Sequence, residues 1–192
     1  MVSVVPGMIV WIGLVAAAAV VAQPALRDEL FAMVTADQGA RDLVVKSAFK
    51  DERALAQMKA LDARNTARLK EIVAAHGWPG KSLVGEKAAH AAWLLVQHAD
   101  ADARFQRRCL ELMEGLPAGE VSAKDIAYLT DRVLLAEGKP QRYGTQFLKD
   151  ASGKWVPKPL EDPEHVEERR KSVGLGSLAD YARGMSETYD RK

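Results

Sequence analysis

Apolar residues recur every three or four positions along most of the chain, which is typical of amphipathic helices. Gly77 with Pro79, and Gly138 with Pro140, are helix-stop signals. Together, the pattern and its signals predict four helices: from a cap at Thr35 or Asp37 to Phe49, and over 51–76, 85–114 and 122–137. A capping box at 122–125 would open the fourth of them.

The periodicity changes after Gly138. Tyr143, Thr145 and Phe147 alternate with other residues in the two-residue repeat of a strand, and Trp155 can begin a returning strand after a turn at 150–153. A lone hairpin is marginal in water, so it must pack on the helices. Two more helices are expected, from Asp162-Pro163 to just before Gly174 and from Ser177 through Met185. The sequence therefore predicts a mainly α, single-domain helical bundle with one small β-hairpin near residues 143–157.

Residues 8–22 form an uncharged apolar run that ends in small residues, as a secretory signal peptide does. The run has no Lys or Arg before it and is long for a signal peptide, so an uncleaved membrane anchor is the alternative. We expect residues 1–22 to be a leader and residues 23–192 to be one periplasmic or secreted domain, or a domain anchored to the inner membrane. With no cysteine at the cleavage point, a lipoprotein is excluded.

Charge and cysteine content narrow the function classes. The chain has 27 basic and 26 acidic residues, so it lacks the basic excess of a nucleic-acid binder. Its one cysteine, Cys109, can form neither an internal disulfide nor a cysteine zinc cluster. Cys109 falls on an apolar helix face, which predicts a buried side chain.

Two polar residues interrupt the apolar stripe of the second predicted helix. The stripe consists of Leu55, Met58, Asp62, Asn65, Leu69 and Ile72. Because an unpaired buried carboxylate costs several kcal/mol, Asp62 needs a partner or solvent. The pair is either a buried polar contact, a seam open to water at that turn, or part of a binding cleft.

His98 interrupts the apolar stripe of the third predicted helix in the same way. At about 100° per residue, Asp102 lies one turn further on the same side, where it could orient the imidazole. Asp100 points nearly opposite to His98, which counts against a metal pair. His98 is thus a satisfied core histidine or a general acid or base.

Further polar residues are candidates for binding. Gln97 adjoins His98, Asp131-Arg132 is a surface or capping pair or a site element, and Tyr143 and Gln146 lie where the hairpin starts. Arg169-Arg170 is a solvated pair or a carboxylate clamp.

Several short motifs together resemble an uncharacterised bacterial family. They are Asp62-x-x-Asn65, Gly77-Trp78-Pro79, the QHAD tetrapeptide at 97–100, Asp131-Arg132, Gly138-x-x-Gln141 followed by YGTQ at 143–146, and Gly174-Leu175-x-x-Leu178-x-x-Tyr181. The resemblance spans about residues 37–181 and implies a mostly helical domain, exported or cytosolic. It carries no established catalytic residues.

The functional hypothesis is a polar cleft where the Asp62 helix, the His98 helix and the Tyr143 hairpin meet. As an enzyme, the domain would be a hydrolase or transferase that uses no cofactor and no metal. The sequence contains no cofactor-binding motif and no metal-binding motif. His98, Asp102, Asp62 and Tyr143 would be catalytic; Asn65, Gln97, Asp100, Asp131, Arg132 and Gln146 would bind the ligand. Alternatively, these residues form a non-catalytic site for a small molecule or cell-envelope component, or a structural network. We expect no nucleic-acid partner, and a membrane contact only through an uncleaved leader.

Overall fold

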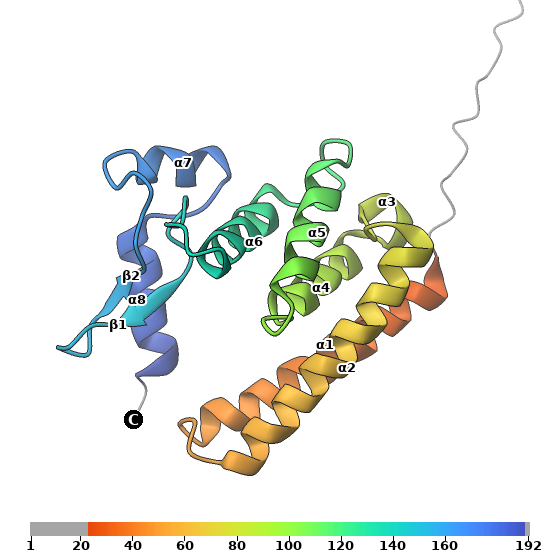
Figure 1. Cartoon of the computed structure of the whole chain (residues 1–192), viewed down its shortest axis with the longest axis horizontal. Helices are drawn as coiled ribbons and strands as arrows, with labels where there is room; N and C mark the ends of the chain where they lie inside the picture. Colours follow the sequence, from red (N-terminus) through yellow and green to blue (C-terminus); the bar gives the residue numbers. More distant parts are fainter. Residues whose placement is uncertain (1–22, 191–192) are drawn as a thin grey trace, which may run out of the picture.

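A long antiparallel pair of helices forms one side of the molecule (Figure 1). The computed structural model describes residues 23–190, so the predicted leader and its cleavage point lie outside the described residues. Helix α1 spans Pro24–Lys46 and α2 spans Glu52–His76. The prediction for α2 is confirmed: the Asp51 side chain caps it, and it ends at Gly77 with a φ of 71°.

The predicted start of the first helix is wrong. α1 begins at Pro24, more than two turns before Thr35, because its apolar stripe starts earlier, at the buried Leu26 and Leu30. Proline suits the first helical position, where its missing N–H has no intrahelical partner to lose. Asp37 is consequently an interior residue of the helix and is buried.

The long third helix of the prediction is broken in two. After the short α3 (Lys81–Val84), α4 spans Glu86–Gln97 and α5 spans Ala103–Glu114. Asp102 caps α5 by accepting a hydrogen bond from the Phe105 N–H, and an Asp that caps favours a helix start over a helix interior. The Gln106 amide donates to the Val96 carbonyl oxygen at the end of α4, which stabilises the break.

Helix α6 spans Ala123–Ala136, close to the prediction. The predicted capping box is wrong, because the Ser122 side chain makes no capping hydrogen bond. The carboxylate of Asp125 instead lies 3.0 Å from Nδ1 of His90 on α4.

The C-terminal part holds the hairpin and two helices. β1 (Phe147–Lys149) pairs antiparallel with β2 (Trp155–Pro157), α7 spans Val166–Ser172 and α8 spans Leu178–Tyr189. The Ser177 cap of α8 is confirmed. The hairpin is shorter than predicted, since Tyr143 and Thr145 precede β1, and α7 starts after His165 instead of at Asp162-Pro163. The hairpin lies beside α8, away from α1 (Figure 1).

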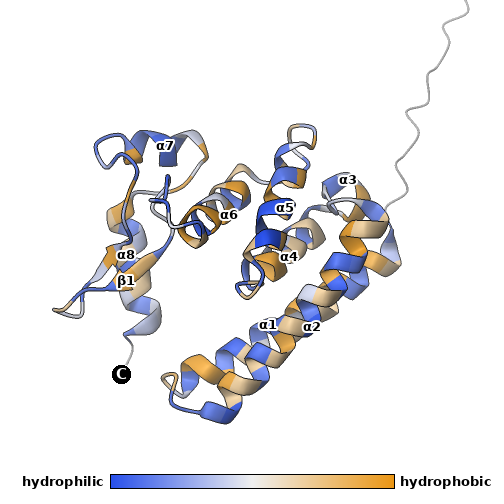
Figure 2. Cartoon of the chain, viewed as in Figure 1, coloured by the Kyte–Doolittle hydropathy of each residue, from blue (hydrophilic) through white to orange (hydrophobic). Residues whose placement is uncertain are grey.

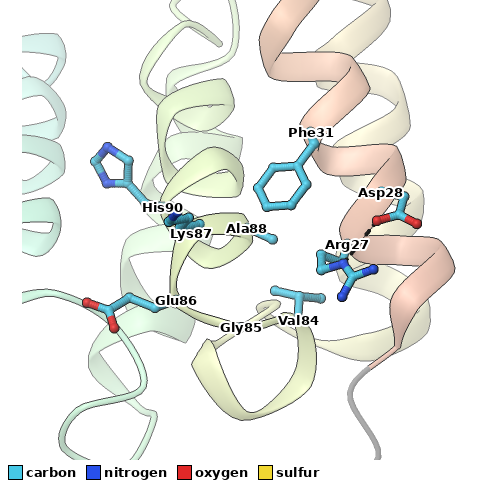
Figure 3. Close-up of a pocket in the computed structure, with 9 residues that line it drawn as sticks. All are labelled: Arg27, Asp28, Phe31, Val84, Gly85, Glu86, Lys87, Ala88 and His90. Carbon is cyan, nitrogen blue, oxygen red and sulfur yellow. Dashed lines mark hydrogen bonds and ion pairs between the residues drawn. The ribbon is translucent and has the colours of Figure 1, made fainter.

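A single core joins α1, α2, α4, α5 and α6, and the mainly α prediction is confirmed. Its centre contains fully buried residues such as Leu30, Leu69, Ala92, Val96 and Leu129, and buried Cys109 confirms that prediction. Hydrophobic and hydrophilic positions alternate around α1 and α2, and α7 is mostly hydrophilic (Figure 2). Among residues 23–190, no helix has the length and hydrophobicity needed to cross a bilayer.

Gly144 provides a test of the packing of the C-terminal part. It has a φ of 65°, and a Cβ there would lie 2.7 Å from Cδ2 of Leu178. We expect Gly144→Ala to lower the free energy of unfolding by about 1–3 kcal/mol through backbone strain and overpacking. The matched control is Gly39→Ala, at an exposed position in α1 with open space around it, which should be neutral or stabilising by about 0.5–1 kcal/mol. Urea unfolding of the full chain measures both; equal stability of the two variants would contradict the packing described.

Candidate functional site

Four charged or titratable side chains meet where α1, α2 and the end of α4 come together. Nδ1 of His98 lies 2.9 Å from Oδ2 of Asp37. Arg41, one turn after Asp37 on α1, donates to Oδ1 of Asp37 and to Oδ1 of Asp62 on α2, both at 2.8 Å. We call these residues the Asp37 cluster: Asp37, Arg41, Asp62 and His98.

The two carboxyls of the cluster have opposite pKa shifts. Burial raises the pKa of Asp37, but the hydrogen bond from His98 and the charges of His98 and Arg41 outweigh it, so its pKa is lowered overall. Burial also raises the pKa of Asp62, and Arg41 compensates only in part while the charge of Asp37 adds to the increase. Asp37 is therefore the more firmly ionised of the two, and pairs of groups driven apart in this way are typical of acid–base sites.

The ionisation of Asp37 sets the tautomer of His98. A carboxylate can only accept hydrogen bonds, so Nδ1 of a neutral His98 must carry the proton and donate it to Asp37. Nε2 then holds the free lone pair, and it makes no hydrogen bond to any residue in 23–190. This is the arrangement in which a buried carboxylate orients a histidine base.

His98 and Asp62 both line a cavity of about 750 Å³. The walls come from α2 and from the connection between α4 and α5; they include Met58, Lys59, Ala63, Thr66, Ala67, Lys70, Ala99, Asp100, Ala101 and Asp102. Asp37 is 0% exposed, whereas the side chains of His98 and Asp62 are 18% and 20% exposed. His98 and Asp62 are therefore partly exposed and line the cavity, whereas Asp37 is buried and is not among the lining residues.

Asn65 lies one turn after Asp62 on the same face of α2. It is 7% exposed, its Nδ2 has no hydrogen-bond partner, and its side chain forms no hydrogen bond within residues 23–190. Buried amides are normally satisfied, so the Asn65 amide is available as a donor. Among residues 23–190 it shares this state with the buried side-chain nitrogens of Trp78, Trp93 and Gln97.

The predicted contact between His98 and Asp102 is wrong. The break after α4 removes the one-turn spacing on which it depended, and His98 contacts Asp37 instead. Asp102 caps α5 and pairs with Lys70 at 2.6 Å, and it still lines the cavity.

Gln97, Asp100 and Arg132 form a brace between α4 and α6. Nε of Arg132 donates to the Gln97 side chain at 3.0 Å, and Nη1 donates to Asp100 at 2.8 Å. Asp100 lines the cavity as well, so it is the one member of this brace that borders the site. Asp131 and Arg132, predicted as a pair, thus have different partners.

Asp131 holds the loop that contains YGTQ. It is fully buried and accepts hydrogen bonds from the backbone N–H groups of Arg142, Tyr143 and Thr145 at 2.7–2.9 Å. Gln146 donates to the Thr145 hydroxyl at 3.2 Å. The residues lining the cavity beside His98 come only from α2 and the α4–α5 connection, so the prediction that the Tyr143 hairpin joins the cleft is wrong.

Arg170 also contacts the loop that contains YGTQ. It is 1% exposed and donates to the carbonyl oxygens of Tyr143 and Gly176 at 2.7 and 2.6 Å. Burial lowers its pKa. The two arginines therefore differ: Arg170 is buried against backbone carbonyls, whereas Arg169 forms an ion pair with Asp162 at 3.3 Å.

The Asp37 cluster also contains potential metal ligands. Asp37, Asp62 and His98 each offer one ligand atom, and these atoms lie within 4.8 Å of one another. Carboxylate and imidazole together suit Zn²⁺ and its neighbours among the transition metals. Arg41 already neutralises part of the negative charge there.

A family model matches residues 24–192. The chain belongs to a family of unknown function, DUF6624. The resemblance to an uncharacterised family is thereby confirmed. No curated protein and no solved structure is significantly similar to this DUF6624 chain.

Asp37 and Arg41 are the site residues that sequence reasoning missed. The stripe of apolar residues at 26, 30 and 44 continues through position 37, so a helix starting at Pro24 places a carboxylate on its buried face. That interruption, with Arg41 four residues on, was the available signal. The interpretation of Asp37 as a helix cap hides this signal.

The two carboxyls should respond differently to removal of charge. The lowered pKa of Asp37 means that its ionised form stabilises the fold, and this stabilisation is lost as pH falls below about 4. We expect Asp37→Asn to cost about 2–4 kcal/mol at pH 7, with the loss shrinking at pH 3. Asp62 has a raised pKa, so its ionisation opposes folding above about pH 4.

Asp62→Asn should therefore leave the free energy of unfolding at pH 7 unchanged or increase it. Its effect at pH 7 should be more favourable than its effect at pH 3. Thermal unfolding of the full chain at both pH values measures the two effects. A loss of stability in Asp62→Asn at pH 7 as large as that in Asp37→Asn would contradict the assignment.

Proposed function

We propose that this chain catalyses hydrolysis or group transfer on a small molecule bound in the cavity beside His98. One observation carries the proposal: Nδ1 of His98 is held by the buried Asp37, while the unbonded Nε2 belongs to a side chain that lines the cavity. A histidine held in this way takes a proton from water or from a substrate hydroxyl with its fixed lone pair.

Asp62 and Asn65 have supporting roles in this proposal. Asp62 has a raised pKa and lines the cavity, so it can exchange a proton with the substrate. The Asn65 amide, one turn along α2, has no hydrogen-bond partner, and the proposal assigns it as a donor to a substrate oxygen, although Asn65 is not among the residues that line the cavity. Arg41 donates a hydrogen bond to each of the two carboxylates, so it holds both in place and reduces the repulsion between them. The cavity walls contain many Ala side chains, which suits a substrate with an apolar part.

Non-catalytic binding of a small molecule or cell-envelope component is the second candidate. The same cavity favours it, because a cavity lined by polar and apolar side chains can hold a ligand without a reaction. A binding protein and an enzyme differ in whether the ligand is consumed.

His98→Ala tests the catalytic role. The full chain is assayed with chromogenic p-nitrophenyl esters, phosphates and glycosides, and we expect turnover of at least one of these classes. His98→Ala should lower kcat/KM by about 100-fold or more, the usual contribution of a general base. The matched control is His90→Ala, since His90 lies on α4, the helix that ends just before His98, and also contacts a buried aspartate, Asp125.

Equal loss in the two variants, or full activity of His98→Ala, would reject His98 as the base. A compound that raises the melting temperature of the wild type without being consumed, and fails to do so with His98→Ala, would favour the binding module.

We further propose that residues 1–22 direct export of the domain. They are then either removed as a signal peptide or retained as an anchor in the inner membrane. The support is the uncharged apolar run at 8–22. With an epitope tag at the C-terminus, the protein should leave the cytoplasmic fraction, and the mass of the mature protein should match a start near Gln23 if the leader is removed. Recovery of the intact chain in the cytoplasm would contradict export.

A further inference from the structure

Two potential ligand atoms of the Asp37 cluster form no hydrogen bond to any residue in 23–190. Oδ1 of Asp62 accepts a hydrogen bond from Arg41, whereas Oδ2 of Asp62 has no hydrogen-bond partner among residues 23–190. Nε2 of His98 is likewise unbonded there. Both side chains line the same cavity.

Both carboxylate oxygens of Asp37, by contrast, already have partners in the protein. Its Oδ1 contacts Arg41 and His98, and its Oδ2 contacts Gln38 and His98. The pattern of a carboxylate behind a histidine, with the far ring nitrogen open, is that of metal-binding histidines in proteins. The carboxylate fixes the tautomer and makes the far nitrogen a better donor of its lone pair, to a metal ion as to a proton.

From this arrangement we propose that the cavity binds a Zn²⁺-like transition-metal ion through Nε2 of His98 and Oδ2 of Asp62, with Asp37 as an outer partner of His98. One ligand atom from each of Asp37, Asp62 and His98 lies within 4.8 Å of the other two, which brings the Asp62 carboxylate and the His98 ring close together. To share one ion, both side chains would rotate until their ligand atoms reach the usual distance of about 2.0–2.2 Å. Water completes the coordination from the cavity.

The charge of the cluster also suits a cation. Asp37 and Asp62 bring two negative charges, and Arg41 cancels one of them. The mixed nitrogen and oxygen ligands favour Zn²⁺ over Mg²⁺, which prefers oxygen ligands and keeps its own waters.

The consequence for catalysis rests on the proposed function. The ion uses the same lone pair that His98 uses as a base, so bound Zn²⁺ should inhibit a metal-free activity. The site would then respond to the local zinc concentration.

Calorimetric titration of the metal-free full chain with ZnCl₂ at pH 7.5 tests the inference without any activity assay. We expect one Zn²⁺ per chain in the wild type and no measurable binding of Mg²⁺. His98→Asn and Asp62→Asn should each weaken binding about 100-fold or abolish it. Asp37→Asn should weaken it about 10–100-fold, as loss of an outer hydrogen-bond partner does. His90→Asn is the matched control and should bind as the wild type does.

Asp62→Asn keeps the inference testable even if His98→Asn does not fold. Zn²⁺ binding that is unchanged in Asp62→Asn or is lost in His90→Asn, or a wild type that binds no Zn²⁺, would overturn the inference. Turnover by the metal-free wild type, abolished in His98→Ala, would uphold the proposed function in either case. Turnover that requires added Zn²⁺ would uphold the metal site and reject His98 as a free base.

Discussion

The buried carboxylate of Asp37 is the constraint on which this arrangement depends. A charge with no exposed surface must be fully hydrogen-bonded, because leaving one partner out costs several kcal/mol. Asp37 meets this requirement with Gln38, Arg41 and His98, and so links α1 to the end of α4. Arg41 extends the link to α2 through Asp62. One buried charge thus positions three helices and fixes the orientation of the imidazole at the cavity.

The two polar clusters of the molecule are used in different ways. Around Asp131 and Arg170, the charged groups bond to backbone N–H and carbonyl groups and hold a loop in place. Around Asp37, Nε2 of His98 and Oδ2 of Asp62 form no hydrogen bond to residues 23–190, and both side chains line the cavity. Buried polar groups of a scaffold are usually hydrogen-bonded, and groups that stay unbonded on side chains lining a cavity are available to a ligand. This difference separates YGTQ, which builds the fold, from His98, which faces the cavity.

Helical periodicity was enough to predict the fold class, α2 and the cap of α8, because those features depend on local patterns. It failed at Asp37 and Asp102, which have similar local signals and opposite roles. Asp102 caps a helix and breaks the predicted third one, while Asp37 lies inside a helix and is buried. Which role an aspartate takes depends on partners distant in the chain, such as His98, 61 residues from Asp37. For the same reason the sequence could place His98 and Asp62 in one site but could not exclude Tyr143 from it.

The central claim is that Asp37 holds His98 with its Nε2 lone pair open to the cavity. The most direct measurement is the ¹⁵N NMR spectrum of the His98 ring, recorded in the full chain above pH 8 where an ordinary histidine is neutral. The account predicts a proton on Nδ1 and none on Nε2 in the wild type, with that preference lost in Asp37→Asn. A proton on Nε2 in the wild type, or the same Nδ1–H form in both proteins, would contradict it.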